Sequence, residues 1–262
     1  MIFAILRFIW AATLCFYWSV QCATRTWLYG PRRSWTYCRI RWGKGVMNAI
    51  KVGWNIQNAE RLTGPSIFVC NHQSFLDVVL LPAIIPPETV IVAKQEVKKV
   101  PILGPAFAAA GAVLVDRSNP RGAISGMRAA VAELPSHWSV ILWPEGTRSV
   151  TGELKHFKKG CIHLALATHY PIVPIAVHGV RELTARWPRG LPRPGTVEIA
   201  VGEPIATDGW THESTDHQLA QVRAAVAQEL SRARAAWAAN ANMESRNVST
   251  SVSPLENSWR PE

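Results

Sequence analysis

The chain has 262 residues, of which 48% are hydrophobic and 18% are charged. This length and apolar content are enough for one substantial domain with its own core, and they exclude disorder for most of the chain. The five cysteines are scattered, with no CxxC pair and an odd total. This pattern argues against a disulfide framework and against a zinc site, so we expect no bound metal.

The net charge of +10 is unevenly distributed. Residues 1–64 hold nine Lys or Arg and one acid, Glu60, whereas the other residues hold 19 basic and 17 acidic side chains. Six of the twelve tryptophans also lie in residues 1–64. Nucleic-acid-binding proteins usually carry their basic residues on the folded domain. Basic residues and Trp beside an apolar run instead indicate anionic membrane lipid as the partner, and no nucleic acid.

The apolar run covers residues 2–23 and is interrupted by Arg7 and Gln21. As a helix it would be roughly 33 Å long, against a hydrocarbon core of about 30 Å, so it can span a membrane. The shorter part after Arg7 also allows a helix that lies in the interface. A cleaved signal peptide is disfavoured because no basic residue precedes Arg7 and several arginines follow the run. We expect an uncleaved anchor in the inner (cytoplasmic) membrane of a bacterium, with the folded domain facing the cytoplasm.

From residue 66 onward, short β-branched runs alternate with helical patterns. The runs that indicate strands are residues 66–70, 89–93, 112–116, 138–143, 171–177 and 196–202. The patterns that indicate helices are residues 73–85, 120–134, 159–168 and 216–239. This alternation predicts an α/β fold with a mostly parallel sheet flanked by helices, preceded by the N-terminal membrane-anchoring helix.

Composition further divides the chain into four segments. We expect a membrane anchor over residues 1–29 and a basic, Trp-rich juxtamembrane segment over residues 30–64. The folded domain is expected over residues 65–239, followed by a polar, disordered tail over residues 240–262.

The stretch NHQSFLD, Asn71–Asp77, follows the first predicted strand of the domain. Five positions on a regular helix subtend about 140°, so His72 and Asp77 cannot meet if both are helical. They can meet if His72 lies on the loop after the strand and Asp77 lies in the first turns of the next helix. A carboxylate on one ring nitrogen would then leave the other nitrogen free to act as a base. The competing interpretation is a capping residue at an ordinary polar turn.

Three further motifs follow other predicted strands, at the sheet edge where ligands bind in open α/β folds. In WPEGTRS, Gly146 lets backbone N–H groups approach an anion and Arg148 can hold a phosphate with two hydrogen bonds. In GAVLVDRSN, Arg117 would suit a dianionic phosphate together with Arg148. In VPIAVHG, Pro174 indicates an edge strand or a bend, and His178 is interpreted as structural.

Several other chemistries are excluded by the absence of their motifs. The chain has no GxSxG nucleophile elbow, no GxxxxGK[ST] loop and no GxGxxG after a strand. Cys70 lies two residues before His72, but it follows an apolar strand and is expected to point into the core. We therefore set it aside as a nucleophile.

In this order, NHQSFLD, GAVLVDRSN, WPEGTRS and VPIAVHG resemble the four sequence blocks of the glycerolipid acyltransferases, in particular those that act on 1-acyl-sn-glycerol-3-phosphate. The resemblance covers residues 64–202, and Trp143 stands where a Phe is usual. It implies that His72 is a general base oriented by Asp77. It also implies that the acceptor's phosphate and glycerol are held by Arg117, Glu145, Gly146, Thr147 and Arg148.

The reaction that the resemblance implies moves a fatty acyl group from acyl-CoA or acyl carrier protein to the sn-2 hydroxyl of 1-acyl-sn-glycerol-3-phosphate, giving phosphatidate. It requires no cofactor and no metal, because the thioester is already activated. The acceptor could instead be another lysolipid, such as lyso-ornithine lipid, or glycerol-3-phosphate. A non-catalytic lipid-binding protein would leave His72 without a role, and a hydrolase would use His72 to activate water.

Overall fold

The computed structural model of the chain describes residues 2–100, 104, 107, 111–116, 120–184 and 192–250, with the backbone alone for 120, 121 and 242–250. The described α-helices are α1 (Ile2–Tyr29), α2 (Pro31–Ala49), α3 (Leu76–Ile84), α5 (Pro120–Ala132), α6 (Gly160–Thr168), α7 (Val180–Thr184) and α8 (Thr215–Thr250). Two short 3-10 helices are η1 (Ala59–Arg61) and η2 (Gln95–Lys99). The described strands are β1 (Val52–Gln57), β2 (Ile67–Cys70), β3 (Thr89–Lys94), β4 (Val113–Val115), β5 (Ser139–Leu142), β6 (Ile172–His178) and β7 (Gly195–Val201).

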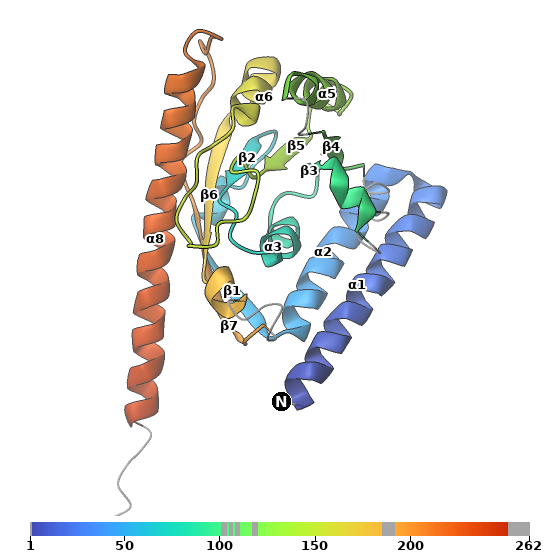
Figure 1. The fold of residues 1–262 in the computed structure, drawn as a ribbon. Helices are drawn as coiled ribbons and strands as arrows, with labels where there is room; N and C mark the ends of the chain where they lie inside the picture. Colours follow the sequence, from blue (N-terminus) through green and yellow to red (C-terminus); the bar gives the residue numbers. More distant parts are fainter. Residues whose placement is uncertain are drawn as a thin grey trace, which may run out of the picture.

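These strands form a seven-stranded sheet in the order β1-β7-β6-β2-β5-β3-β4. Every neighbouring pair is parallel except β6 and β7, which are antiparallel. The predicted α/β fold with a mostly parallel sheet is therefore confirmed. Helices cover both faces of the sheet, with the α1–α2 pair on one side and α8 on the other (Figure 1).

The alternation of side chains along β2 shows how the two faces are filled. Phe68 and Cys70 are fully buried and face a cluster that includes residues of α2 and α3. Ile67 and Val69 are equally buried and face a cluster that includes residues of α5, α6 and α8. A strand buried on both faces reads as a continuous apolar run, as this one does.

Residues 30–64 are part of the folded domain, so the boundary expected at residue 64 is not present. Strand β1 pairs in parallel with β7 from Val52 to Gln57 and forms one edge of the sheet. Helix α2 buries Trp35 and Trp42, and the indole Nε1 of Trp35 donates to the Thr89 carbonyl at 3.0 Å. Trp35 and Trp42 are thus core residues, because α2 turns them towards the sheet, whereas Trp10 and Trp27 on α1 are exposed.

Of the two features predicted from Pro174, an edge strand or a bend, the edge strand is wrong, because β6 lies in the interior of the sheet between β2 and β7. The Pro174 carbonyl accepts the N–H of Gly202 at 2.9 Å, so the proline nitrogen also faces β7. The antiparallel ladder between β6 and β7 starts one residue later, at Ile175. The missing N–H therefore falls just outside that ladder and leaves the pairing with β2 intact.

At the C-terminal end, helix α8 continues to Thr250 rather than ending at residue 239. The first part of the expected tail is therefore helical. Residues 251–262 lie outside the described residues, so their predicted disorder stays a prediction.

The side chain of Arg39 connects α2 to the rest of the domain. It is fully buried, and its guanidinium donates to the carbonyls of Pro82, Ile85 and Pro86 at the C-terminal end of α3. A cation at this position also complements the helix dipole. Burial lowers the pKa of Arg39 to about 10, against the opposing effect of Glu88. The guanidinium therefore remains charged at neutral pH and satisfies carbonyls that would otherwise be buried without a partner.

We predict that Arg39→Ala lowers the free energy of unfolding by about 2–4 kcal/mol, because it leaves buried carbonyls without donors. Thermal unfolding in detergent micelles measures the effect. Arg41→Ala is the matched control, because Arg41 lies on the same helix with an exposed side chain, and its effect should stay within about 0.5 kcal/mol. Equal melting temperatures for the two variants would contradict the role of Arg39.

Candidate active site

Two loops start side by side at the carboxyl edge of the sheet. Strand β2 ends at Cys70 and the neighbouring β5 ends at Leu142, with Val69 opposite Leu142 in the parallel register. The loop after β2 is also fixed to β6, because the amide of Asn71 exchanges two hydrogen bonds with the backbone of Val177, at 2.9 and 2.8 Å. The sheet thus brings the NHQSFLD and WPEGTRS motifs together.

His72 lies on the loop after β2, and Asp77 lies in the first turn of α3. The ring nitrogen Nδ1 of His72 is 2.8 Å from Oδ2 of Asp77, which is the contact expected from the sequence. An ionised carboxylate can only accept hydrogen bonds, so Nδ1 carries the proton and Nε2 is left with a lone pair. This geometry suits a general base.

The carboxylate of Asp77 is completely buried and is held by the backbone as well as by the imidazole. Its Oδ2 accepts the N–H groups of Gln73 at 2.7 Å and Ser74 at 2.8 Å. Three donors thus converge on one buried oxygen. Asp77 is therefore fixed to the loop that carries His72.

The imidazole of His72 remains partly open to solvent. Its side chain is 16% exposed, compared with 0% for Asp77. The ring of Trp143 lies beside it, with centroids 5.3 Å apart and an angle of 38° between the ring planes. The imidazole is thus packed against an aromatic wall and keeps an accessible side that a substrate can reach.

Glu145 faces inward rather than towards the open side of its turn. One carboxylate oxygen accepts the backbone N–H of His72 at 2.7 Å, and the other accepts the N–H of Lys155 at 3.1 Å. Burial raises the pKa of Glu145, and these two hydrogen bonds offset part of the rise. Its carboxylate therefore holds the backbone of the site together, and a direct contact between Glu145 and an acceptor is not favoured.

The turn after Glu145 presents groups suited to an anion. Gly146 has a φ of +75°, and the side chains of Thr147 and Arg148 are exposed. The backbone N–H groups of Thr147 and Arg148 make no hydrogen bond to any described residue. The Nζ of Lys155 lies 2.6 Å from the hydroxyl of Thr147 and adds a second positive charge. Backbone N–H groups beside a glycine, together with basic side chains, form the kind of concave site that binds phosphate.

Arg117, the other predicted phosphate ligand, lies outside the described residues. Cys70 is completely buried, and burial raises the pKa of its thiol well above the ordinary value, so it remains a neutral core residue as expected. Within the part of the chain that the structure describes, no group of three or more His, Cys, Asp or Glu residues is arranged to hold a metal ion.

Three residues of the site were not identified from the sequence. Asn71 connects β2 to β6, Gln73 donates its backbone N–H to Asp77, and the N–H of Ser149 donates to the His72 carbonyl at 2.7 Å. Asn71 and Gln73 flank His72 directly, so their polarity after an apolar strand was a usable signal. The contact of Ser149 depends on the path of a loop, and no local pattern encodes it.

Comparison with known proteins defines the class to which this fold and site belong. The model of the Acyltransferase family matches residues 53–178, which contain both motifs of the site. A crystal structure of the 1-acyl-sn-glycerophosphate acyltransferase PlsC from Thermotoga maritima has the same fold, with a TM-score of 0.68 over 87% of this chain and 94% of that one. At 23% identity, this likeness concerns the fold alone.

Relatives found by sequence similarity indicate which kind of acyltransferase this chain resembles. The chain is 39% identical to the 1-acyl-sn-glycerol-3-phosphate acyltransferase of Limnanthes alba, over 70% of this chain and 68% of the relative. It is 37% identical to the enzyme of that name from Cocos nucifera, over 72% of this chain, and spans 64% of that relative's length. For the enzyme from Saccharomyces cerevisiae the identity is 35%, and the chain spans 53% of it. The chain belongs to the family of 1-acyl-sn-glycerol-3-phosphate acyltransferases.

We predict that Glu145→Gln destabilises the protein by about 1–3 kcal/mol, because the amide has one accepting oxygen where the carboxylate satisfies two backbone N–H groups. Its amide nitrogen would face the remaining N–H. Chemical unfolding monitored by tryptophan fluorescence measures the loss. The control is Glu133→Gln, an exposed carboxylate whose replacement should have little effect. If both variants unfold like the wild type, Glu145 does not organise the site.

Proposed function

We propose that the protein transfers a fatty acyl group from an acyl thioester to the sn-2 hydroxyl of 1-acyl-sn-glycerol-3-phosphate (lysophosphatidate), producing phosphatidate. The observation that carries the proposal is the 2.8 Å contact between Nδ1 of His72 and the buried carboxylate of Asp77. It leaves Nε2 of a partly exposed imidazole available as a base beside an anion-binding turn. The relatives named as 1-acyl-sn-glycerol-3-phosphate acyltransferases support this acceptor.

In the proposed mechanism, Nε2 of His72 takes the proton from the acceptor hydroxyl while its oxygen attacks the thioester carbonyl carbon. The tetrahedral intermediate then expels the thiolate, which takes the proton from the imidazolium. Asp77 holds the imidazole in the required tautomer and stabilises the transient positive charge, as a buried carboxylate does in other base-catalysed acyl transfers. No covalent acyl-enzyme forms, and the activated thioester removes the need for a cofactor or a metal.

The acceptor phosphate is proposed to bind at Gly146–Arg148. The guanidinium of Arg148 can donate two hydrogen bonds to a phosphate, and the backbone N–H groups of Thr147 and Arg148 can donate further ones. Arg117 is proposed to bind the same group, as the family motif implies. A phosphate monoester fits this set of donors better than the zwitterionic headgroup of lyso-ornithine lipid, which carries no phosphate.

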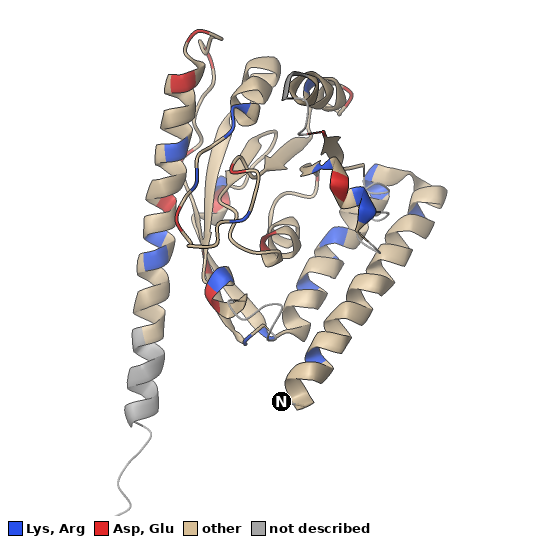
Figure 2. Cartoon of the chain, in the orientation of Figure 1, with Lys and Arg blue, Asp and Glu red and all other residues tan. Residues whose placement is uncertain are grey.

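Membrane association is proposed to occur through α1. Among the described helices, α1 is the one long and apolar enough to cross a membrane, and most of its length is free of charge, whereas α2 carries Lys and Arg along several turns (Figure 2). Its exposed apolar residues are Ile2, Phe3, Ile5, Leu6, Ile9, Trp10, Phe16, Tyr17, Val20, Trp27, Leu28 and Tyr29. An exposed apolar surface of this kind marks a site of interaction with a membrane or a protein.

We further propose that α1 lies along the membrane interface rather than across the bilayer. Helix α2 packs against α1, with Nε1 of Trp42 3.4 Å from Sγ of Cys15, and Arg39 fixes α2 to α3. An upright α1 would therefore draw the basic residues of α2 into hydrocarbon, at about 2.5–3.5 kcal/mol for each charge. Lying flat, α1 buries its apolar face while those charges meet the headgroups. The inner membrane of a bacterium, with the domain on the cytoplasmic side, remains our proposed location.

We predict that His72→Ala and Asp77→Asn lower kcat by about 10²–10⁴-fold, because the first removes the base and the second removes the charge that orients it. Release of free thiol from acyl-CoA and from acyl carrier protein, with and without lysophosphatidate, measures the rate. His217→Ala is the control, because His217 is exposed on α8.

The same assay, run with each donor against lysophosphatidate, lyso-ornithine lipid and glycerol-3-phosphate, tests the acceptor. Mass spectrometry of the product should identify phosphatidate. Thiol release that does not depend on any acceptor would indicate a hydrolase instead. Near-normal turnover by both variants would rule out the proposed mechanism.

We predict that Phe16→Asp weakens binding to vesicles of phosphatidylglycerol and phosphatidylcholine by at least about tenfold, because burying one large apolar side chain contributes about 1.5–3 kcal/mol. Phe16 is 54% exposed, so the substitution should leave the fold intact. Vesicle flotation measures binding, with Ala224→Asp on the exposed side of α8 as the control. Equal flotation of the two variants would show that α1 does not face the lipid.

A further inference from the structure

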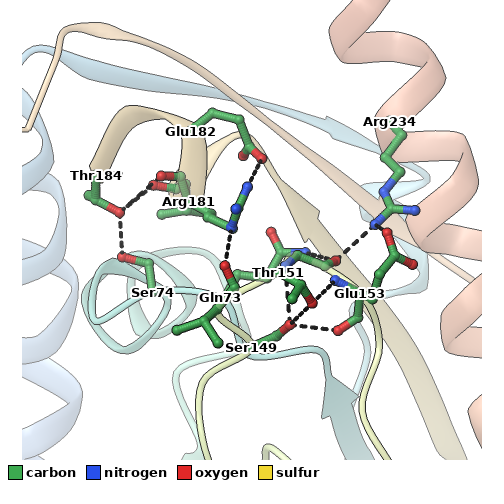
Figure 3. Close-up of polar contacts among 12 residues, drawn as sticks. Gln73, Ser74, Ser149, Thr151, Glu153, Arg181, Glu182, Thr184 and Arg234 are labelled. Carbon is green, nitrogen blue, oxygen red and sulfur yellow. Dashed lines mark hydrogen bonds and ion pairs between the residues drawn. The ribbon is translucent and has the colours of Figure 1, made fainter. Parts of the chain in front are cut away.

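A tight turn at residues 149–153 connects the catalytic loop to the helices that follow it in the chain (Figure 3). On its inner side, the N–H of Ser149 donates to the carbonyl of His72 at 2.7 Å, and Nε2 of Gln73 donates to the carbonyl of Gly152 at 3.0 Å. The hydroxyl of Ser149 closes the turn by donating to the Glu153 carbonyl at 2.6 Å. The turn therefore touches the backbone of the catalytic residue directly.

On its outer side, the turn is held by two arginines from other helices. Nη2 of Arg234, on α8, donates to the carbonyl of Gly152 at 2.8 Å and lies 2.9 Å from the carboxylate of Glu153. Nε of Arg181, on α7, donates to the carbonyl of Val150 at 2.8 Å. Figure 3 shows Arg234 reaching the turn from α8, on the far side from Gln73. Both arginines lie after residue 178, where the match to the family model ends.

The contacts of Arg234 hold the turn in place at two adjacent residues, Gly152 and Glu153. One guanidinium nitrogen bridges the carbonyl of Gly152 and the side chain of the next residue, and a planar guanidinium loses little freedom in making such paired contacts. Its helix packs on the sheet through the core cluster, and the neighbouring Ala233 is completely buried. Gly152 adopts a φ of +85°, a conformation that glycine takes readily and that allows the tight turn.

We propose that Arg234 is a positioning residue for acceptor binding, a role that rests on the proposed function. Arg148 immediately precedes Ser149, so the placement of the turn sets the position of the Arg148 backbone N–H and the point from which its side chain extends. His72 depends less on the turn, because Glu145 holds its backbone and Asp77 holds its ring. Through Arg234, helix α8 thus contributes to binding of the acceptor phosphate more than to proton transfer by His72.

The test compares Arg234→Ala with the wild type under steady-state conditions, varying lysophosphatidate and the acyl donor separately. We expect the KM for lysophosphatidate to rise about tenfold, with kcat and the KM for the donor within about threefold, since small misplacements of a binding group cost this much or more. Arg234→Lys should recover part of the acceptor affinity, because an ammonium can still reach the Gly152 carbonyl. Arg232→Ala is the matched control, since Arg232 lies on the same helix but pairs with Glu229.

A purely structural role would lower the melting temperature and affect both substrates together. An unchanged KM for lysophosphatidate in Arg234→Ala, or a parallel rise in the donor KM, would overturn the proposal. If Arg234→Ala does not fold, Arg234→Leu, which keeps the apolar stem but has no donor, decides, and a wild-type acceptor KM in that variant overturns the proposal. Wild-type protein that transfers no acyl group to lysophosphatidate would overturn the proposed function and this role with it. Normal wild-type transfer with an unaffected variant would overturn the role of Arg234 alone.

Discussion

A single carboxylate oxygen, Oδ2 of Asp77, accepts hydrogen bonds from the ring of His72 and from the backbone of Gln73 and Ser74. A buried charge of this kind is stable only when donors surround it, so the loop after β2 and the start of α3 must keep one arrangement. The far end of the same helix is held by Arg39, whose guanidinium donates to its last carbonyls. Helix α3 is therefore fixed at one end by the site and at the other by α2, and the N-terminal helices become part of the support of the site.

Glu145 complements Asp77 by holding the backbone of the same histidine. Asp77 contacts the ring and Glu145 contacts the backbone N–H of the same histidine, so two buried acids fix one residue through different atoms. Both carboxylates make their hydrogen bonds within the site, which leaves the turn proposed to bind phosphate to Arg148, Lys155 and backbone N–H groups that make no hydrogen bond to a described residue. Acids that would repel a phosphate are thus turned inward, and the groups that attract it are turned outward.

The sequence predicted those parts of the molecule that local patterns encode. The strand-to-helix context of NHQSFLD required His72 on a loop and Asp77 on a helix, and the structure has this arrangement. The separation of residues 30–64 from the domain was wrong for two reasons. Trp and Arg are common both at membrane interfaces and in a helix that turns its tryptophans inward. Strand β1 pairs with β7, which is more than 130 residues away in the chain, so no local pattern predicts the pairing. The prediction for Pro174 failed for a similar reason. Proline has no N–H, and whether this removes a hydrogen bond depends on which neighbouring strand its nitrogen faces. The inward direction of Glu145 depends on the N–H of Lys155, and no motif states where that donor will lie.

The arrangement of the helices bears on how a lipid could reach the site. Helices α2 and α3 share one face of the sheet, and α1 packs on the outside of α2. In the proposed placement of α1 along the interface, this face is directed to the membrane, and α3 carries Asp77, which contacts His72 on the loop after β2. A lysophospholipid then needs to expose only its glycerol and phosphate to the loops, because its acyl chain can stay among the lipids. Since removing a long acyl chain from the bilayer costs about 0.8 kcal/mol for each CH₂ group, a site placed in this way avoids the largest barrier to binding such an acceptor.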